Sequence, residues 1–172
     1  MKRIMFLSVL LFVFPCLVLG QTTTKADTAQ LDPKLLTMYQ GLFDKAWSQK
    51  FAELWNINPD TAKVFGGMGK VHFVSLGTDT VDALMNFDST GKAAVLGVAK
   101  SFPKDTLPAF SALLEKWAEF MEGKFGAVKG VMTGKIKFQG NWAVAFKYGF
   151  KFDKVAPVGK RASELISQKK KK

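Results

Sequence analysis

Histidine and cysteine, the side chains most often used as metal ligands and in nucleophilic catalysis, occur once each in this sequence of 172 residues, as His72 and Cys16. A zinc cage, a cysteine–histidine dyad and a disulfide framework all need more of these residues than the chain has. A lone histidine within a strand-like run is typical of a residue whose hydrogen bonds are satisfied locally. We therefore expect no metal site and no cofactor.

Carboxylates and glycines give no stronger sign of catalysis. Asp79 and Asp82 fall in and beside a predicted turn, and Glu115 and Glu119 fall on the polar side of a predicted helix. We interpret both pairs as solvated surface. The glycine-rich run at 66–69 lacks the lysine and hydroxyl that end a phosphate-binding loop, and it precedes a strand rather than a helix. The sequence thus predicts a protein that is not an enzyme.

The composition is that of one folded domain. Hydrophobic residues make up 48% of the chain and aromatic residues 13%, with 16 phenylalanines. Such a content excludes a disordered or fibrous chain, and the length fits a single domain.

The first residues have the pattern of a targeting segment. A short positive start is followed by an almost wholly apolar run over 4–19, and Val18 and Gly20 precede a cleavage position. This pattern predicts a signal peptide over 1–20, with a retained membrane anchor as the alternative. Cys16 lies inside the apolar run, so the mature chain would contain no cysteine. We expect export, to the periplasm or the medium, and a flexible lead-in over 21–32.

Positive charge is concentrated at the C-terminal end. Residues 21–122 hold 10 basic and 12 acidic residues, whereas residues 123–172 hold 13 basic and 2 acidic ones. We predict a basic tail over 155–172 that docks on anionic membranes, since each lysine near such a surface contributes about 1 kcal/mol. The alternative is a solubilising tail. The residues assigned to docking are Lys160, Arg161, Lys169, Lys170, Lys171 and Lys172.

Hydrophobic periodicity predicts an α+β fold, with an antiparallel sheet of about five strands and helices packed on one face. Helices are expected to begin at Asp32-Pro33 and at Asn58-Pro59, where a capping residue precedes a proline. Three strands should form a meander between turn-like segments. The predicted helices are 33–56, about 59–65, 107–122, 127–132 and 142–148, and the predicted strands are 70–76, 81–87, 92–99 and 135–139.

The predicted helices carry more large apolar side chains than are needed to cover a sheet whose strands contain many small residues. The four tryptophans, Trp47, Trp55, Trp117 and Trp142, fall on the main predicted helices. They are either ordinary core or the lining of a cavity for an apolar ligand, because such pockets are lined mainly by hydrophobic and aromatic side chains.

One stretch carries a recognisable motif. Residues 119–147 read EFMEGKFGAVKGVMTGKIKFQGNWAVAFK, and within them 132–141 read MTGKIKFQGN. This stretch resembles the C-terminal half of the sterol carrier protein type-2 domain. The resemblance covers about 43–150 and places a sterol-carrier-like domain at 33–154. It implies a five-stranded sheet with helices on one face, enclosing a hydrophobic tunnel for acyl chains, sterols or other lipids. Residues 101–106 are short for the fourth strand that members place before the long helix, so we expect them to lead directly into a helix.

The resemblance also implies which residues lie near the tunnel. To these we add three apolar residues of the predicted long helix. The expected ligand-binding residues are Trp117, Phe120, Met121, Met132, Ile136, Phe138, Trp142, Ala145 and Phe146.

The sequence as a whole predicts non-enzymatic binding, and transfer, of a long-chain lipid in the cell envelope, the lipid being a fatty acid, a sterol-like molecule or a polyprenoid. The alternatives are a structural or interaction protein that keeps the fold without a ligand, and a basic protein of membrane surfaces. Nucleic acid is not an expected partner, because Arg161 is the only arginine after the leader and arginine is the usual reader of bases.

Overall fold

The structure of the protein is a computed structural model that describes residues 32–101 and 104–170. The expected signal peptide and nearly all of the expected lead-in lie outside the described residues, as do Lys171 and Lys172. None of the helices within the described ranges has the length and apolar character needed to cross a membrane.

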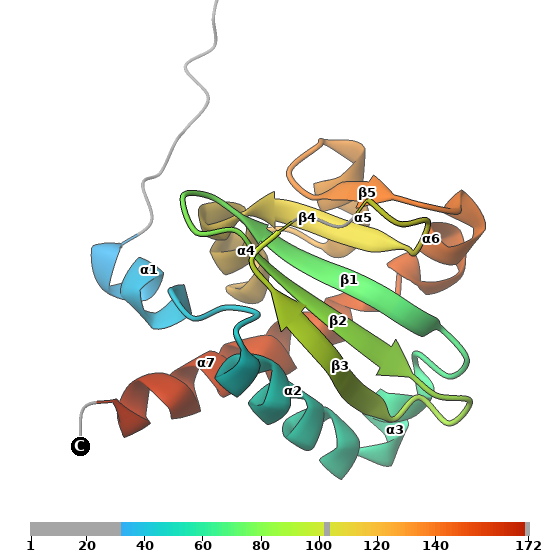
Figure 1. Cartoon of the computed structure of the whole chain (residues 1–172), viewed down its shortest axis with the longest axis horizontal. Helices are drawn as coiled ribbons and strands as arrows, with labels where there is room; N and C mark the ends of the chain where they lie inside the picture. The colour runs from blue at the N-terminus through green and yellow to red at the C-terminus, as the bar shows by residue number, and fades with distance from the viewer. Residues whose placement is uncertain (1–31, 102–103, 171–172) are drawn as a thin grey trace, which may run out of the picture. The chain divides into compact units, whose positions relative to one another are not determined.

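A five-stranded sheet forms one layer of the fold (Figure 1). The expected meander is confirmed, since β1, β2 and β3 pair antiparallel in succession. The sheet is mixed, however, because β4 lies parallel to β1 with His72 opposite Ala109. The prediction of a purely antiparallel sheet was therefore wrong. The strands are β1 Gly69–Leu76, β2 Val81–Phe87, β3 Ala93–Ala99, β4 Ala109–Leu113 and β5 Lys137–Gln139, in the spatial order β3-β2-β1-β4-β5.

Strand β4 is the fourth strand that the sequence reading left out. We expected a helix from residue 107, but Ala109–Leu113 is a strand and the helix α4 covers Leu114–Met121. The first four residues of β4 are buried, whichever face of the sheet they point to. A short apolar run buried on both faces shows no polar alternation, so periodicity does not separate it from the start of a buried helix.

The first predicted helix is two helices, α1 Pro33–Tyr39 and α2 Lys45–Ile57. Phe43 lies between them with a positive φ of 67°, and its buried ring contacts those of Trp47 and Trp117 edge-on. The side chain of Asp44 then accepts a hydrogen bond from Trp47 N at 2.7 Å and starts α2. Core packing of the Phe43 ring thus breaks a segment that is helical by pattern. The next start signal is confirmed, because Asn58 caps α3 Pro59–Lys63.

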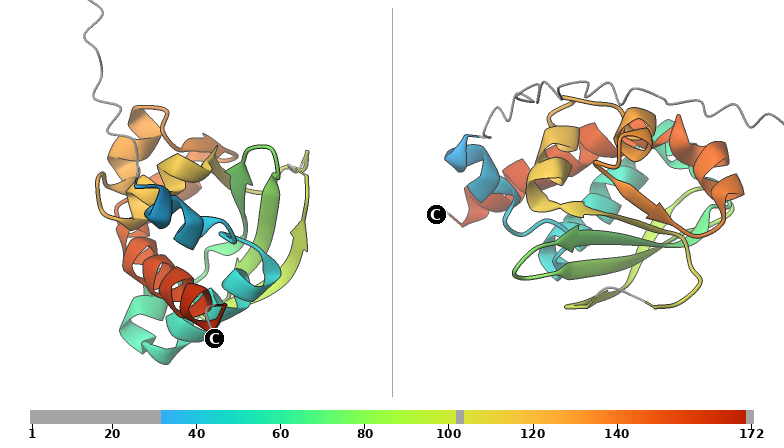
Figure 2. Two further views of the ribbon diagram at one scale, coloured as in Figure 1. Left: turned by 90° about the vertical axis from the view of Figure 1, so that its left-hand side faces the viewer. Right: turned by 90° about the horizontal axis from the view of Figure 1, so that it is seen from above.

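The C-terminal part contains α5 Ala127–Met132, α6 Trp142–Gly149, a short 3₁₀ helix Phe152–Lys154 and α7 Val155–Lys169. The helices lie together on one face of the sheet (Figure 2). On that face a core of stacked and edge-on aromatic rings connects the two layers, from Trp47 and Phe51 on α2 to Phe73 on β1 and Phe152.

Residues 155–169 are a packed helix where a tail was expected. Five residues of α7 are buried, among them Ala162 and Ser163, and Trp47 Nε1 donates to Ser163 Oγ at 2.9 Å. At Gly159 a Cβ atom would come within 2.5 Å of the sulfur of Met121. Lys160 Nζ donates to Glu122 Oε2 at 2.7 Å. The small residues on one side of this basic helix allow close packing, which a count of charges does not reveal.

Candidate functional site

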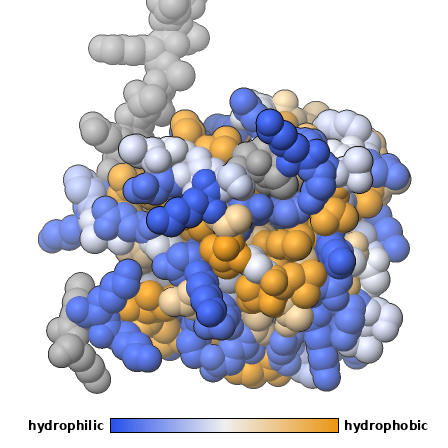
Figure 3. Space-filling view, viewed as in Figure 1, coloured by the Kyte–Doolittle hydropathy of each residue, from blue (hydrophilic) through white to orange (hydrophobic). Residues whose placement is uncertain are grey.

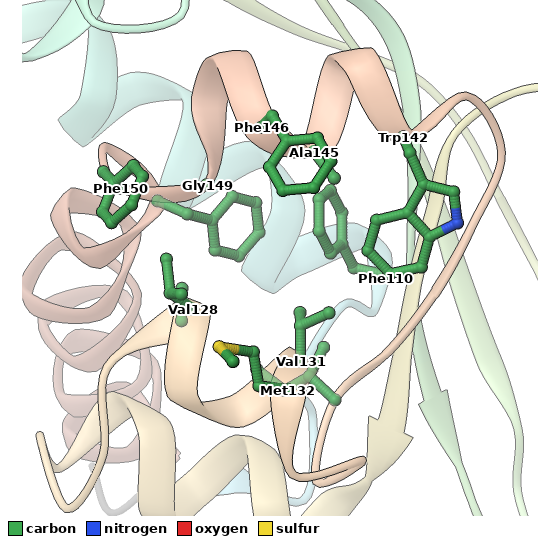
Figure 4. Close-up of a pocket in the computed structure, with 12 residues that line it drawn as sticks. Phe110, Val128, Val131, Met132, Trp142, Ala145, Phe146, Gly149 and Phe150 are labelled. Atoms are coloured by element: carbon green, nitrogen blue, oxygen red, sulfur yellow. The ribbon is translucent and has the colours of Figure 1, made fainter.

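An apolar cavity of about 360 Å³ lies between α5 and α6 (Figure 4). Strand β4 and the 3₁₀ helix contribute one residue each. Every lining residue is a hydrophobic residue or a glycine, and none carries an ionisable side chain. The residues are Phe110, Ala127, Val128, Val131, Met132, Ile136, Trp142, Ala145, Phe146, Gly149, Phe150 and Phe152.

The cavity has a buried floor and an exposed rim. Phe110, Ile136 and Phe152 form the floor and are 3% exposed or less. The rim consists of side chains that are largely exposed: Met132 is 82% exposed, Trp142 53%, Phe146 72% and Phe150 78%. Soluble proteins rarely gather several large exposed apolar residues in one place unless the patch binds something.

Glycines and caps hold the two walls in position. The amide of Ile136 donates to the carbonyl oxygen of Gly130 at 3.0 Å, and this returns the chain from α5 toward β5. At Gly130 a Cβ atom would lie 2.6 Å from the Phe125 ring, so the close approach needs a glycine. The side chain of Asn141 accepts from Ala143 N at 2.9 Å and starts α6. Asp153 accepts from Ala127 N at 2.6 Å and caps α5 from the neighbouring 3₁₀ helix.

Five of the nine residues expected to bind a ligand line this cavity, namely Met132, Ile136, Trp142, Ala145 and Phe146. Phe138 lies beside it, with its ring centroid 5.0 Å from that of Phe110 and 5.2 Å from that of Trp142.

The three residues added from the predicted long helix lie elsewhere. Trp117, Phe120 and Met121 are buried in the core between the sheet and the helices, and Trp117 Nε1 donates to the carbonyl oxygen of Val74 at 2.8 Å. They do not line this cavity, because the apolar face of α4 packs on β1, α1 and α7.

Sequence reasoning missed several lining residues that lie near those it named. Phe150 follows Trp142 and Phe146 at intervals of four residues, and this spacing places the three rings on one side of a helix. The signal was therefore present in the sequence. Phe110 gave no such signal, since its contact with the cavity depends on β4 being a strand.

A cluster of polar residues, separate from the apolar cavity, lies on the outer face of the sheet, away from the helices. His72 Nδ1 lies 2.9 Å from both carboxylate oxygens of Asp82, and His72 Nε2 lies 3.0 Å from Asp105 Oδ2. Asp82 is only 5% exposed, so its interpretation as solvated surface was wrong. Burial raises the pKa of the Asp82 carboxyl above its ordinary value, and the hydrogen bond with His72 partly offsets this effect. In the described part of the chain no group of His, Cys, Asp or Glu side chains has an arrangement suited to a metal ion.

Comparisons with known proteins agree with this architecture. No protein-family model and no curated protein sequence matches the chain. Among solved structures, a conserved hypothetical protein from Thermus thermophilus, suggested to be a sterol carrier protein, matches at 16% identity. The match covers 70% of this chain and 89% of that chain with a TM-score of 0.61. A crystal structure of sterol carrier protein 2 matches at 18% identity over 69% of this chain and 97% of that chain, with a TM-score of 0.59.

This chain has the sterol carrier protein 2 fold. The resemblance seen in the sequence is therefore confirmed at the level of the fold. Within this sterol carrier protein 2 fold, the stretch 119–147 that carried the resemblance covers the end of α4, all of α5, strand β5 and most of α6. It thus forms much of the cavity wall.

Proposed function

We propose that the protein is a non-enzymatic lipid carrier that binds one long-chain apolar molecule in the cavity between α5 and α6. The observation that carries the proposal is the lining, in which all twelve residues are apolar or glycine. A cavity of about 360 Å³ lies within the range of roughly 300–1,000 Å³ typical of small-molecule sites. Similarity to structures named as sterol carrier proteins supports the same class of ligand.

The chemistry of the lining selects the part of a lipid that enters. Each methylene transferred from water into an apolar site gains about 0.8 kcal/mol. A polar headgroup inside would lose its water without a hydrogen-bond partner, which costs about 1–3 kcal/mol. The acyl or polyprenoid chain therefore enters, and the headgroup stays outside the rim.

The presence of the cavity favours a ligand over the alternative of a structural protein that keeps the fold alone. In such a protein the core aromatics would fill the space themselves. Here Trp117 and Phe120 pack elsewhere, and the rim leaves Phe146 and Phe150 exposed. The signal-like start of the sequence leads us to place this binding in the cell envelope.

Trp142 offers a direct test. It is 53% exposed at the rim, whereas Trp47, Trp55 and Trp117 are 2% exposed or less. A fatty acid brominated along its chain should quench the emission of Trp142 with saturable, one-to-one stoichiometry. Native mass spectrometry of protein purified from cells should show a co-purified lipid.

The Trp142→Phe variant supplies the control, because it keeps an aromatic ring at the rim and removes the reporter. Its remaining emission should hardly change with the brominated acid, although native mass spectrometry should still detect the bound lipid. The proposal would be contradicted if no lipid co-purified and the brominated acid did not quench the emission of Trp142.

A further inference from the structure

The segment that forms most of the cavity wall is strongly basic, although Asp153 contacts it at the start of α5 by accepting from Ala127 N. Residues 124–151, which include α5, β5 and α6, contain six lysines and no aspartate or glutamate. Lys135 is partly neutralised, with its Nζ 3.8 Å from Glu119 Oε2. Lys129 on α5 and Lys151 after α6 are exposed, and neither takes part in an ion pair among the residues that the structure describes.

The same segment bears the exposed rim of the cavity. Trp142, Phe146 and Phe150 project from α6 and its end, and Met132 projects from α5 (Figure 4). Lys147 and Lys151, both exposed, each follow one of these phenylalanines in the sequence, so they border the aromatic side of α6 and its end rather than lying on it. Exposed aromatic rings next to lysines are the combination found where a protein surface enters the interface of a membrane.

We propose that the α5–α6 face, defined by Lys129, Lys147, Lys151 and the rim residues, docks on the surface of an anionic phospholipid bilayer. The lysines are attracted to the negative headgroups, and the rings of Trp142 and Phe150 enter the interface between headgroups and acyl chains. The inference rests on the proposed function in one respect, since docking there places the mouth of the lipid cavity on the bilayer.

Charge complementarity favours this face over the C-terminal residues that the sequence suggested. Lys160 is paired with Glu122, and Arg161 with Glu164, so two of those six cations already have partners. The C-terminal end of α7 lies at the opposite end of the described domain from α6 (Figures 1 and 2). A hydropathy view of the open sheet face shows an apolar patch bordered by hydrophilic residues (Figure 3). Strand β3, at the edge of the sheet, bears the exposed residues Leu96 and Val98 but no charged residue.

The test compares two charge-matched variants in a vesicle-sedimentation assay with equal parts phosphatidylcholine and phosphatidylglycerol at low salt. The double variant Lys129→Gln/Lys151→Gln removes two lysines from the α5–α6 face. The control Lys169→Gln/Lys170→Gln removes two from the end of α7. Because a basic residue at an anionic surface changes partitioning about fivefold, the first variant should bind about 25-fold more weakly. The control should bind within about twofold of the unmodified protein.

Two further readouts separate docking from ligand binding. Phospholipids brominated in the upper acyl chain should quench Trp142 in the mixed vesicles, and added salt should abolish this. Affinity for lauryl alcohol, an uncharged ligand, should be equal in both double variants. Failure of lauryl alcohol to bind would refute the carrier function while leaving vesicle docking intact.

Three results would overturn the docking proposal. The first is that the control variant loses vesicle binding while the Lys129/Lys151 variant keeps it, which would locate docking at the C-terminal lysines. The second is equal binding to pure phosphatidylcholine vesicles. The third is a dimer in sedimentation velocity without vesicles, with Trp142 shielded from acrylamide, because a second copy would then cover this face.

Discussion

Filling the cavity from its wall provides the sharpest test of where a lipid binds. Ala145 lies on α6 and faces α5 across the cavity, which has a volume of about 360 Å³ (Figure 4). In Ala145→Phe the added ring would occupy the space that an acyl chain needs. It would contact Val131 and Ile136, which are apolar, so the substitution should leave the fold intact.

The expected loss of affinity follows from the area that the ring takes over. A phenylalanine side chain buries about 150 Å² or more when fully enclosed. At about 25 cal/mol per Å², half of that area represents about 2 kcal/mol of contact that the ligand no longer makes. The dissociation constant of a long-chain fatty acid should therefore rise about 30-fold.

The matched control is Ala143→Phe, because Ala143 lies on the same helix, is exposed and does not line the cavity. Both variants carry the same small cost in helix propensity, about 0.5 kcal/mol. Isothermal titration calorimetry with palmitic acid measures the affinities, and thermal unfolding measures stability. If both variants unfold like the unmodified protein and Ala145→Phe binds palmitic acid with unchanged affinity, the cavity is not the lipid site.

Three further predictions use the same assays. Shortening a fatty acid by two methylenes within the cavity should raise its dissociation constant about 15-fold, and a constant affinity across chain lengths would contradict an enclosed chain. Burial of Glu122 opposes its ionisation, but hydrogen bonds from Lys160 and Tyr39 outweigh burial and lower the pKa of the carboxyl group. The stabilisation of the fold by ionised Glu122 is therefore present above the unfolded-state pKa of 4.5 and is lost as pH falls through the folded-state pKa. Glu122→Gln should cost about 2 kcal/mol at neutral pH in urea unfolding and nothing at the acid end, and a pH-independent difference would contradict this. Trp142→Asp should weaken lipid binding yet change stability by less than about 1 kcal/mol, because the side chain is 53% exposed and an acidic residue suits the first turn of α6.

The prediction for Trp142→Asp depends on the exposure of this side chain. If Trp142 were buried, an unpaired charge there would unfold the domain or abolish ligand uptake. A deletion after Val158 is not a suitable test of the basic C-terminal residues, because it would remove Ser163 and Lys160 from their contacts with Trp47 and Glu122.

The sequence by itself determined most elements that depend on neighbouring residues. Capping side chains and prolines marked the starts of α1 and α3, and short strand-like runs between turn-like segments marked β1, β2 and β3. The turns around β5 also followed from local chemistry, because Gly134 and Gly140 have positive φ, which glycine adopts without strain. These features are set within a few residues of chain, so a linear reading detects them.

Only the tertiary structure decided which elements meet. The parallel pairing of β4 with β1, the break at Phe43 and the packing of α7 depend on partners that are far away in the sequence. For the same reason, the sequence pattern did not distinguish Trp117 from Trp142, because both are large apolar residues on predicted helices. Hydrophobic spacing predicts that a side chain is shielded from water. Whether it lies in the closed core or lines an open cavity depends on the elements that pack against it. Trp117 meets the sheet and becomes core, whereas Trp142 packs beside the rings of Phe138 and Phe146 and remains at an open rim.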